Sequence, residues 1–223
     1  MRKTLILLTV LLWGVMSVGS CSKEKNASTG TGGYDNLEFH YLSCAEIQAS
    51  TNEQTIMLKL GPEKEDVHLS AIEDAIREYN SSQSRHGQSG SEPGSPSGSL
   101  GVISYTFEKL ENITVTSDVA LFGKEAGEDI GEYFQIVGSS GYLVKQDLTV
   151  LGRIPQGTSL KEYVEMDCFA LPVLSITFKE QPKREDPVEA TFTVTYFFGA
   201  GFASTHEERA STKITLSPNI INT

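Results

Sequence analysis

The sequence predicts an all-β fold, an antiparallel β-sandwich with one amphipathic helix and a long disordered loop. Three observations predict it. Several short segments alternate apolar with polar residues, the pattern of strands with one face in a core and one in solvent. Glycine, proline and asparagine separate these segments, as expected at turns. Only one segment shows the apolar spacing of a helix, which argues against a fold of alternating strands and helices.

The body begins with two expected strands. Residues 37–42 alternate apolar and polar side chains and predict the first strand. Residues 56–60 repeat the pattern and predict the second strand, which Gly61 and Pro62 are expected to end. The polar residues 48–54 between them predict a loop.

The single predicted helix begins at Ser70. Ser70 and Glu73 have the spacing of a capping box, and apolar residues follow at i, i+4 and i+7 from Ile72. Residues 80–82, Asn-Ser-Ser, are expected to end the helix. Its apolar face predicts that it covers an open end or face of a sheet, and a helix that binds a partner is the alternative.

Residues 81–101 consist mainly of Ser, Gly, Pro and Gln and predict a disordered segment, because they offer too little apolar surface to fold. We interpret them as a mobile insertion in one domain, residues 34–223, since the roughly fifty residues before them are marginal for an independent core. The alternative is two small tandem sandwiches, divided either at this insertion or near Gly141.

The β pattern is strongest in the remainder of the chain. Further strands are predicted at residues 103–107, 113–116, 174–178, 190–198 and 213–216. The last three follow one another through loops alone, which predicts an antiparallel meander. Residues 199–210 are rich in Gly and polar side chains and predict a turn and a loop before the last strand.

Residues 127–134 and 157–164 resemble each other. Each has a glycine, then a capping residue (Asp129 or Ser159), then a glutamate three positions later, the spacing of a capping box that opens a short helical turn. A duplicated strand-turn-helix unit would explain the likeness, and so would the same local solution used twice. In both cases the tyrosines that follow would occupy equivalent places.

The chain is acidic. Its 223 residues include 18 Lys and Arg against 29 Asp and Glu, a formal charge of −11. Such a surface repels nucleic acid, and no cluster of Lys and Arg interrupts it, so we expect no nucleic-acid partner. The simplest consequence of the charge is solubility, whereas cation binding would need a cluster of ligands.

No motif predicts a catalytic residue, a metal site or a cofactor. A run that begins at His206 starts like a zinc-protease motif but lacks the second histidine of His-Glu-x-x-His. No Gly-x-Ser-x-Gly elbow occurs. Cys168 follows Asp167, whose charge would raise rather than lower the pKa of a thiol.

Two of the three cysteines lie in the body, Cys44 and Cys168. An even number in an oxidising compartment could form one disulfide, which would close a long loop. Two separate buried thiols are the alternative, since cysteine is also common in cores. Both alternatives stay open, because the sequence gives no Cα separation.

The N-terminus has the layout of an export signal. Arg2 and Lys3 precede an apolar run over residues 5–18, which is too short for a comfortable membrane span. The run ends in Val-Gly-Ser-Cys, residues 18–21, which resembles the lipobox of bacterial lipoproteins. That resemblance implies cleavage just before Cys21 and a lipid on its thiol, which would attach the protein to a membrane. An uncleaved anchor helix is the alternative.

On this interpretation, residues 1–20 are a removed signal peptide and residues 21–33 a lipidated, flexible tether. The signal, the Gly-rich tether and the Thr-rich strands together resemble the cell-envelope lipoproteins of Bacteroidetes. The expected sandwich resembles immunoglobulin-like or transthyretin-like domains. The resemblance implies an outer-membrane protein that is anchored on the periplasmic side or at the cell surface.

The expected function is a non-enzymatic binding or structural role towards a protein or glycan partner, because the tethered β-scaffold carries no catalytic motif. Phe197 and Phe202 are candidates for an exposed contact patch on this scaffold, with packing at the edge of the core as the alternative. The alternative function is an envelope hydrolase of glycans or peptides whose acidic residues converge only in the fold.

Overall fold

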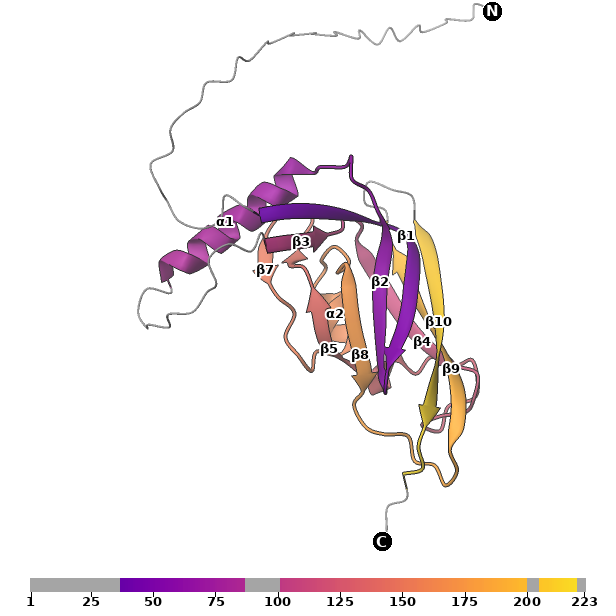
Figure 1. The fold of residues 1–223 in the computed structure, drawn as a ribbon. Helices are drawn as coiled ribbons and strands as arrows, with labels where there is room; N and C mark the ends of the chain where they lie inside the picture. The colour runs from indigo at the N-terminus through magenta and orange to yellow at the C-terminus, as the bar shows by residue number, and fades with distance from the viewer. Residues whose placement is uncertain (1–36, 87–100, 200–204, 220–223) are drawn as a thin grey trace, which may run out of the picture. The chain divides into compact units, whose positions relative to one another are not determined.

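Two β-sheets and a short β-ribbon make up the described part of the protein (Figure 1). The computed structural model describes residues 37–86, 101–199 and 205–219. The elements are β1 (Leu37–Asn52), β2 (Thr55–Glu63), α1 (Ser70–His86), β3 (Gly101–Tyr105), β4 (Leu110–Ser117), η1 (Gly131–Tyr133), β5 (Phe134–Ser140), β6 (Leu143–Val144), β7 (Val150–Gly152), α2 (Leu160–Glu165), β8 (Val173–Phe178), β9 (Val188–Phe198) and β10 (His206–Leu216). Within the described ranges, one sheet has the strand order β3-β1-β2-β8-β5 and the other β10-β9-β4, while β6 pairs with β7.

The predicted fold class, an all-β sandwich with one substantial helix, is confirmed. The described strands pair antiparallel, except that β1 and β3 are parallel. The main core contains side chains from both sheets, such as Ile176 of β8 and Val115 of β4. The alternation of apolar and polar residues explains how β9 contributes to this core, since Phe192 and Phe198 are fully buried while Thr193 between them is not. Each such buried aromatic contributes about 1.5–3 kcal/mol to folding.

The first two strands are longer than predicted. β1 continues through residues 48–52, which we expected in a loop, and β2 continues past Gly61 to Glu63. Gln48 is exposed while Ile47 beside it is buried. Polar residues therefore do not exclude a strand here, because they occupy its solvent face while the backbone pairs with β2.

β1 has two halves with different neighbours. Residues 37–41 pair in parallel with β3. The pairing with β2 begins at Leu42, shifts register before Glu46, and continues antiparallel to the end of the strand. Figure 1 shows the resulting bend, with the first half of β1 beside β3 and the second half beside β2. This bend creates the corner at which the candidate site lies.

The predicted meander of the last three strands is wrong. β8 lies in the five-stranded sheet, whereas β9 and β10 form a hairpin in the other sheet. Residues 179–187 therefore connect the two sheets. Alternation predicts which face of a strand is buried but not which strand is its neighbour, because both sheets bury one face in the same core. β10 also begins at His206, inside the predicted loop, because it pairs with β9 along its whole length.

α1 covers one end of the five-stranded sheet, as predicted. Ile72 and Ile76 are buried and pack with Phe39 of β1 and Tyr105 of β3. Figure 1 shows the helix beside the first half of β1 and β3. These contacts form a second, smaller core cluster that fixes the helix to the bend of β1.

Two predicted details of α1 are wrong. The helix runs to His86 instead of ending at residues 80–82, because both serines there donate to carbonyl groups of the preceding turn and leave the backbone helical. Glu73 does not close a capping box with Ser70. Its carboxylate accepts a hydrogen bond from the hydroxyl of Tyr105.

The two similar segments differ in structure. Ser159 forms the predicted capping box with Glu162 and opens α2. Asp129 instead accepts hydrogen bonds from the backbone amides of Gly131 and Val115, which ties η1 to β4. The tyrosines that follow are not equivalent either, since Tyr163 is buried whereas Tyr133 is partly buried and stacks on Phe122. The likeness is therefore local.

Residues 1–36, with the predicted signal, Cys21 and tether, lie outside the described residues, as do residues 87–100 of the predicted insertion. The first part of that insertion, residues 81–86, is the end of α1. The described residues belong to one compact unit. In the described ranges, no helix has the length and apolar character needed to cross a membrane.

Candidate functional site

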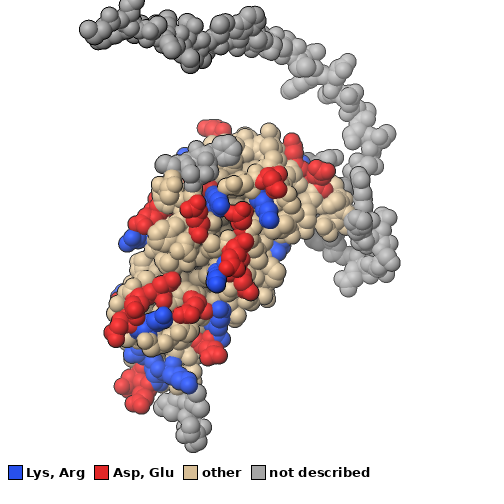
Figure 2. All heavy atoms as spheres, turned by 180° about the vertical axis from the view of Figure 1, so that it is seen from behind, with Lys and Arg blue, Asp and Glu red and all other residues tan. Residues whose placement is uncertain are grey.

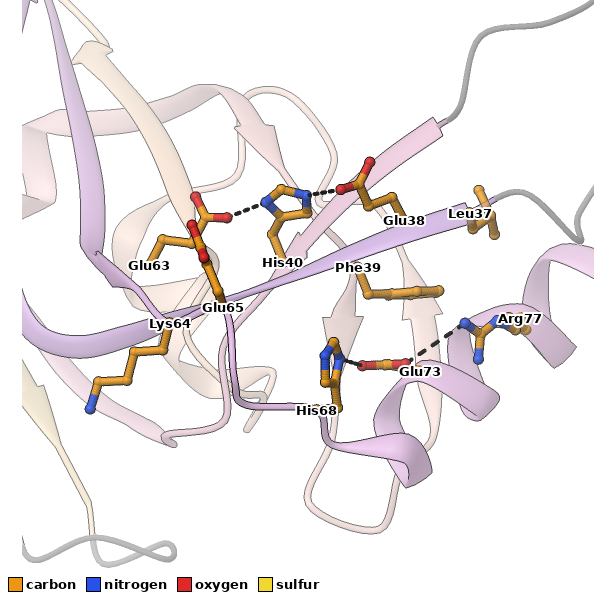
Figure 3. Close-up of a pocket in the computed structure, with 10 residues that line it drawn as sticks. All are labelled: Leu37, Glu38, Phe39, His40, Glu63, Lys64, Glu65, His68, Glu73 and Arg77. Atoms are coloured by element: carbon orange, nitrogen blue, oxygen red, sulfur yellow. Dashed lines mark hydrogen bonds and ion pairs between the residues drawn. The ribbon is translucent and has the colours of Figure 1, made fainter. Parts of the chain in front are cut away.

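A hollow of about 300 Å³ lies at the bend of β1, and it is the candidate site (Figure 3). Three segments line it: residues 37–40 of β1, residues 63–65 at the end of β2, and the entry and first turns of α1 within residues 68–77. The pairing of Leu42 with Glu63 brings the first two segments together. The packing of α1 on β1 adds the third.

β1 divides the hollow into two sides, because neighbouring side chains of a strand point in opposite directions. Figure 3 shows Glu38 and His40 on one side with Glu63, which we call the acidic side. Phe39 points the other way, toward α1. We call this the helix side, and it also holds His68, Glu73 and Arg77 (Figure 3).

His40 is the centre of the acidic side. Its Nε2 lies 3.1 Å from Oε1 of Glu38, and its Nδ1 makes a short contact with Oε1 of Glu63. The hydrogen bond with Glu38 raises the pKa of His40 above its ordinary value, Glu63 adds to the shift, and partial burial opposes it. The imidazole therefore stays protonated to a higher pH than a free histidine.

Glu73 is the centre of the helix side and is only 8% exposed. Its carboxylate accepts a hydrogen bond of 3.0 Å from Tyr105 and lies 3.5 Å from Nδ1 of His68 and 3.7 Å from Nη2 of Arg77. The guanidinium of Arg77 lies over the Phe39 ring, 4.6 Å from its centroid. Burial raises the pKa of Tyr105 to about 12, and the Glu73 carboxylate adds to the shift, so the hydroxyl stays a donor.

The hollow has an excess of negative charge. Its lining glutamates are Glu38, Glu63, Glu65 and Glu73, and its lining cations are Lys64 and Arg77. Protonation of His40 reduces this excess without removing it. On the face of the body that is seen from behind the view of Figure 1, Lys and Arg side chains lie among Asp and Glu (Figure 2). A local excess of one sign in a concave site attracts a ligand of the other sign.

These groups can bind ions and transfer protons. The described lining residues include no serine, threonine or cysteine that could act as a nucleophile. A glycosidase needs two carboxylates on either side of its substrate, whereas Glu38 and Glu63 both contact one imidazole. Throughout residues 37–86, 101–199 and 205–219, no three or more His, Cys, Asp and Glu side chains are grouped to hold a metal ion. What the lining offers is carboxylates and imidazoles around one concave space.

A second histidine–carboxylate pair lies away from the hollow, and we call it the seam pair: His206 of β10 with Glu108, just before β4. Nδ1 of His206 lies 3.5 Å from Oε2 of Glu108, and its Nε2 lies 3.1 Å from the carbonyl oxygen of Cys44 in β1. The imidazole stacks on Phe198 with ring centroids 4.8 Å apart. Oε2 of Glu108 is buried and makes no hydrogen bond with the described residues, and the His206 imidazole is the ring that faces it.

Cys44 and Cys168 are free thiols in the structure, and both are buried. Both belong to the main core. Burial raises the pKa of the Cys44 thiol far above its ordinary value, and the Glu108 carboxylate adds to the shift. Burial raises the pKa of Cys168 to about 11, against the opposite effect of Lys145. Neither thiol is a ready nucleophile, because the thiolate is the reactive form.

The predicted contact patch is described only in part. Phe197 lies on the outer face of β9, opposite in direction to Phe198 in the core. It is partly buried and pairs with Asn112 of β4 and Glu207 of β10. Phe202 lies outside the described residues, so a patch formed by the two phenylalanines stays a prediction.

Sequence reasoning names no residue of the hollow as a site. The available signal is the Glu-x-His spacing of Glu38 and His40, which puts both side chains on one face of the first strand. Glu63 joins them only through the pairing of β1 with β2. Glu73 joins only because α1 packs on β1, which spacing along the chain does not predict.

Comparisons with protein-family models, with curated proteins and with solved structures found no match to this chain. The hollow is therefore interpreted from its own chemistry.

Proposed function

We propose that this chain is a lipid-anchored protein of the bacterial outer membrane that binds a basic segment of a partner protein in the hollow. The observation that carries the binding role is the excess of carboxylates around one concave site, where four glutamates face Lys64, Arg77 and the imidazole of His40. Such a site attracts lysine or arginine side chains. The fold acts as a scaffold that holds β1, β2 and α1 in place around them.

Charge favours a protein partner over a neutral glycan. Neutral sugars could donate hydrogen bonds to the carboxylates without a net electrostatic attraction, whereas a lysine or arginine donates hydrogen bonds and is attracted by charge. Glu65 lines the hollow and is exposed, so such a side chain can reach it. An exposed ion pair contributes only about 0–1 kcal/mol. Charge alone therefore gives weak binding, and a tight complex needs further contacts in the same hollow.

The anchor part of the proposal depends on Cys21. Its support is the sequence of residues 1–21, and several acyl chains on one residue hold a protein at a membrane more firmly than one chain. Cells fed labelled palmitate are expected to label the wild-type protein, and Cys21→Ala is expected to abolish the label and release the protein from the membrane fraction. A variant that keeps the label would refute the lipid site at this residue.

The binding part is tested by titrating the mature chain, in detergent, with a short lysine-containing peptide. The same peptide with glutamine for lysine, and a neutral oligosaccharide, serve as comparison ligands. We expect the lysine peptide to bind at least about tenfold more tightly than either, with an affinity that falls as salt is added. Glu65→Gln should weaken binding, whereas Glu185→Gln, an exposed glutamate outside the hollow, should not. Tighter binding of the oligosaccharide would replace the protein partner with a glycan.

A further inference from the structure

One edge of β1 lacks a strand partner over its first four residues. On its other edge, residues 37–41 pair with β3. The pairing with β2 begins only at Leu42, opposite Glu63. In the described part of the chain, no strand pairs with the β2-side edge of β1 over residues 37–40.

The hollow runs along this open edge. Side chains of a strand alternate between its two faces, so a hollow on one face touches every second residue. Here four consecutive residues, 37–40, line the same hollow. Figure 3 shows the acidic side above β1 and the helix side below it, with β1 passing between them. The space therefore borders the backbone of β1 where its peptide groups point sideways toward the missing neighbour.

We propose that the partner's basic segment binds there in extended form, as an added β-strand along residues 37–40 of β1. This inference rests on the proposed function and specifies how the same hollow is used. Main-chain hydrogen bonds to the open edge supply contacts that do not depend on side chains, and the two sides of the hollow select side chains. Added strands are a recurrent mode of peptide recognition at exposed sheet edges.

The two sides predict the sequence pattern of the bound segment. Alternate side chains of an extended peptide point the same way, at a rise of about 3.3 Å per residue. One set would face Glu38, His40 and Glu63 on the acidic side, so lysine or arginine is expected at these positions. The other set would face Phe39 and the stem of Arg77, so aliphatic residues are expected between the basic ones.

The test compares peptides of one composition on the full mature chain. The parent probe has the sequence Val-Lys-Val-Lys-Val with blocked ends, and its control has the two lysines adjacent at one end. Two further probes carry N-methyl groups on alternate amides, one set along each edge of the peptide, so that all probes have the same charge. We expect one methylated probe to lose at least about tenfold in affinity and the other to bind like the parent, because only one edge faces β1.

Amide hydrogen exchange of the protein tests the added strand independently of peptide affinity. The parent peptide is expected to slow amide exchange within residues 37–40, and a variant with weakened charge, Glu65→Gln, should still show this protection at saturating peptide. Equal binding of all four probes would overturn the added strand and leave charge recognition intact. No binding by the parent, the shuffled control or any other basic probe would instead refute the proposed function.

The occupant could also be a segment of this chain. A synthetic peptide of residues 22–33, which contain Lys23 and Lys25, is therefore included as a competitor. The proposal expects it to compete at least about tenfold more weakly than the parent probe, since it lacks the alternating aliphatic residues. Equal or stronger competition would overturn the assignment to a partner protein.

Discussion

His40 and His206 each lie beside a glutamate, and the comparison separates an exposed histidine–carboxylate contact from a buried one. The side chains of His40 and His206 are almost equally exposed, 28% and 26%. Their carboxylate partners differ, since Glu38 is 55% exposed whereas Glu108 is 10% exposed. A solvent-exposed carboxylate can exchange its partner for a ligand at a small cost in free energy. A buried carboxylate that loses its partner costs several kcal/mol, because water does not replace the lost contact. The exposure of the anion, not of the histidine, decides the role.

The largest expected loss of stability follows from removing His206 of the seam pair. His206→Ala should lower the free energy of unfolding by about 2–3 kcal/mol, because it leaves the buried Oε2 of Glu108 without the imidazole that lies beside it. Denaturant unfolding of the two proteins measures the difference. The double variant with Glu108→Gln should recover about 1 kcal/mol, since the buried charge is then gone. Equal stability of the single and double variants would contradict the electrostatic explanation.

A related effect should appear at Cys44, whose carbonyl group contacts His206. In the wild-type protein neither Cys44 nor Cys168 should react with a thiol reagent under native conditions, because both are buried and both thiol pKa values are raised. In His206→Ala the contact between β10 and β1 at the seam pair should open more often, and Cys44 should react with the reagent at least about tenfold faster. Cys168 serves as the internal control. If the labelling rates of both thiols rise equally, the variant opens the whole fold and not only the contact between β10 and β1.

His40→Ala should have a much smaller effect on stability than His206→Ala. Its two carboxylate partners are exposed and regain water when the imidazole is lost, so the free energy of unfolding should fall by no more than about 1 kcal/mol. The same denaturation assay measures it. A loss as large as that of His206→Ala would show that the acidic side is a structural contact and would count against its availability for a ligand.

The smallest expected effect is a pH dependence at His40. Its pKa is raised in the folded protein, so its contribution to stability is fully present below the ordinary value of 6.5 and is lost as the pH rises through the folded pKa. Wild type and His40→Ala should therefore converge in stability with rising pH. NMR titration of the imidazole should give a pKa above 6.5 that falls in Glu38→Gln, and an unchanged value in that variant would remove Glu38 as the principal cause.

The sequence predicts local structural features better than it predicts which strands pair with each other. The alternation in β9, the apolar face of α1 and the capping box of Ser159 all have their cause within a few residues, and all are confirmed. The parallel pairing of β1 with β3 and the separation of β8 from β9 depend on which sheet a strand joins. Period-two alternation is the same in either sheet, so it cannot distinguish them.

The candidate site was beyond sequence reasoning for the same reason. Glu38 and His40 are placed by alternation alone, but Glu63 and Glu73 reach them through a strand pairing and a helix packing contact. The capping spacing of Ser70 and Glu73 even points to another role for Glu73. In the fold, Tyr105 offers its carboxylate a buried hydroxyl instead. The role of Glu73 is therefore set by its tertiary contact with Tyr105, although its spacing from Ser70 predicts a helix cap.

The divided pairing of β1 also has a mechanical consequence. A pull applied at Leu37 along the first half of β1 would load its hydrogen bonds to β3 across the strand axis. Bonds loaded in this direction must break together by sliding, whereas bonds loaded at one end of a hairpin open one after another. A lipid anchor at the N-terminus would thus pull the domain in its more resistant direction. A strand bound at the open edge would raise the rupture force further.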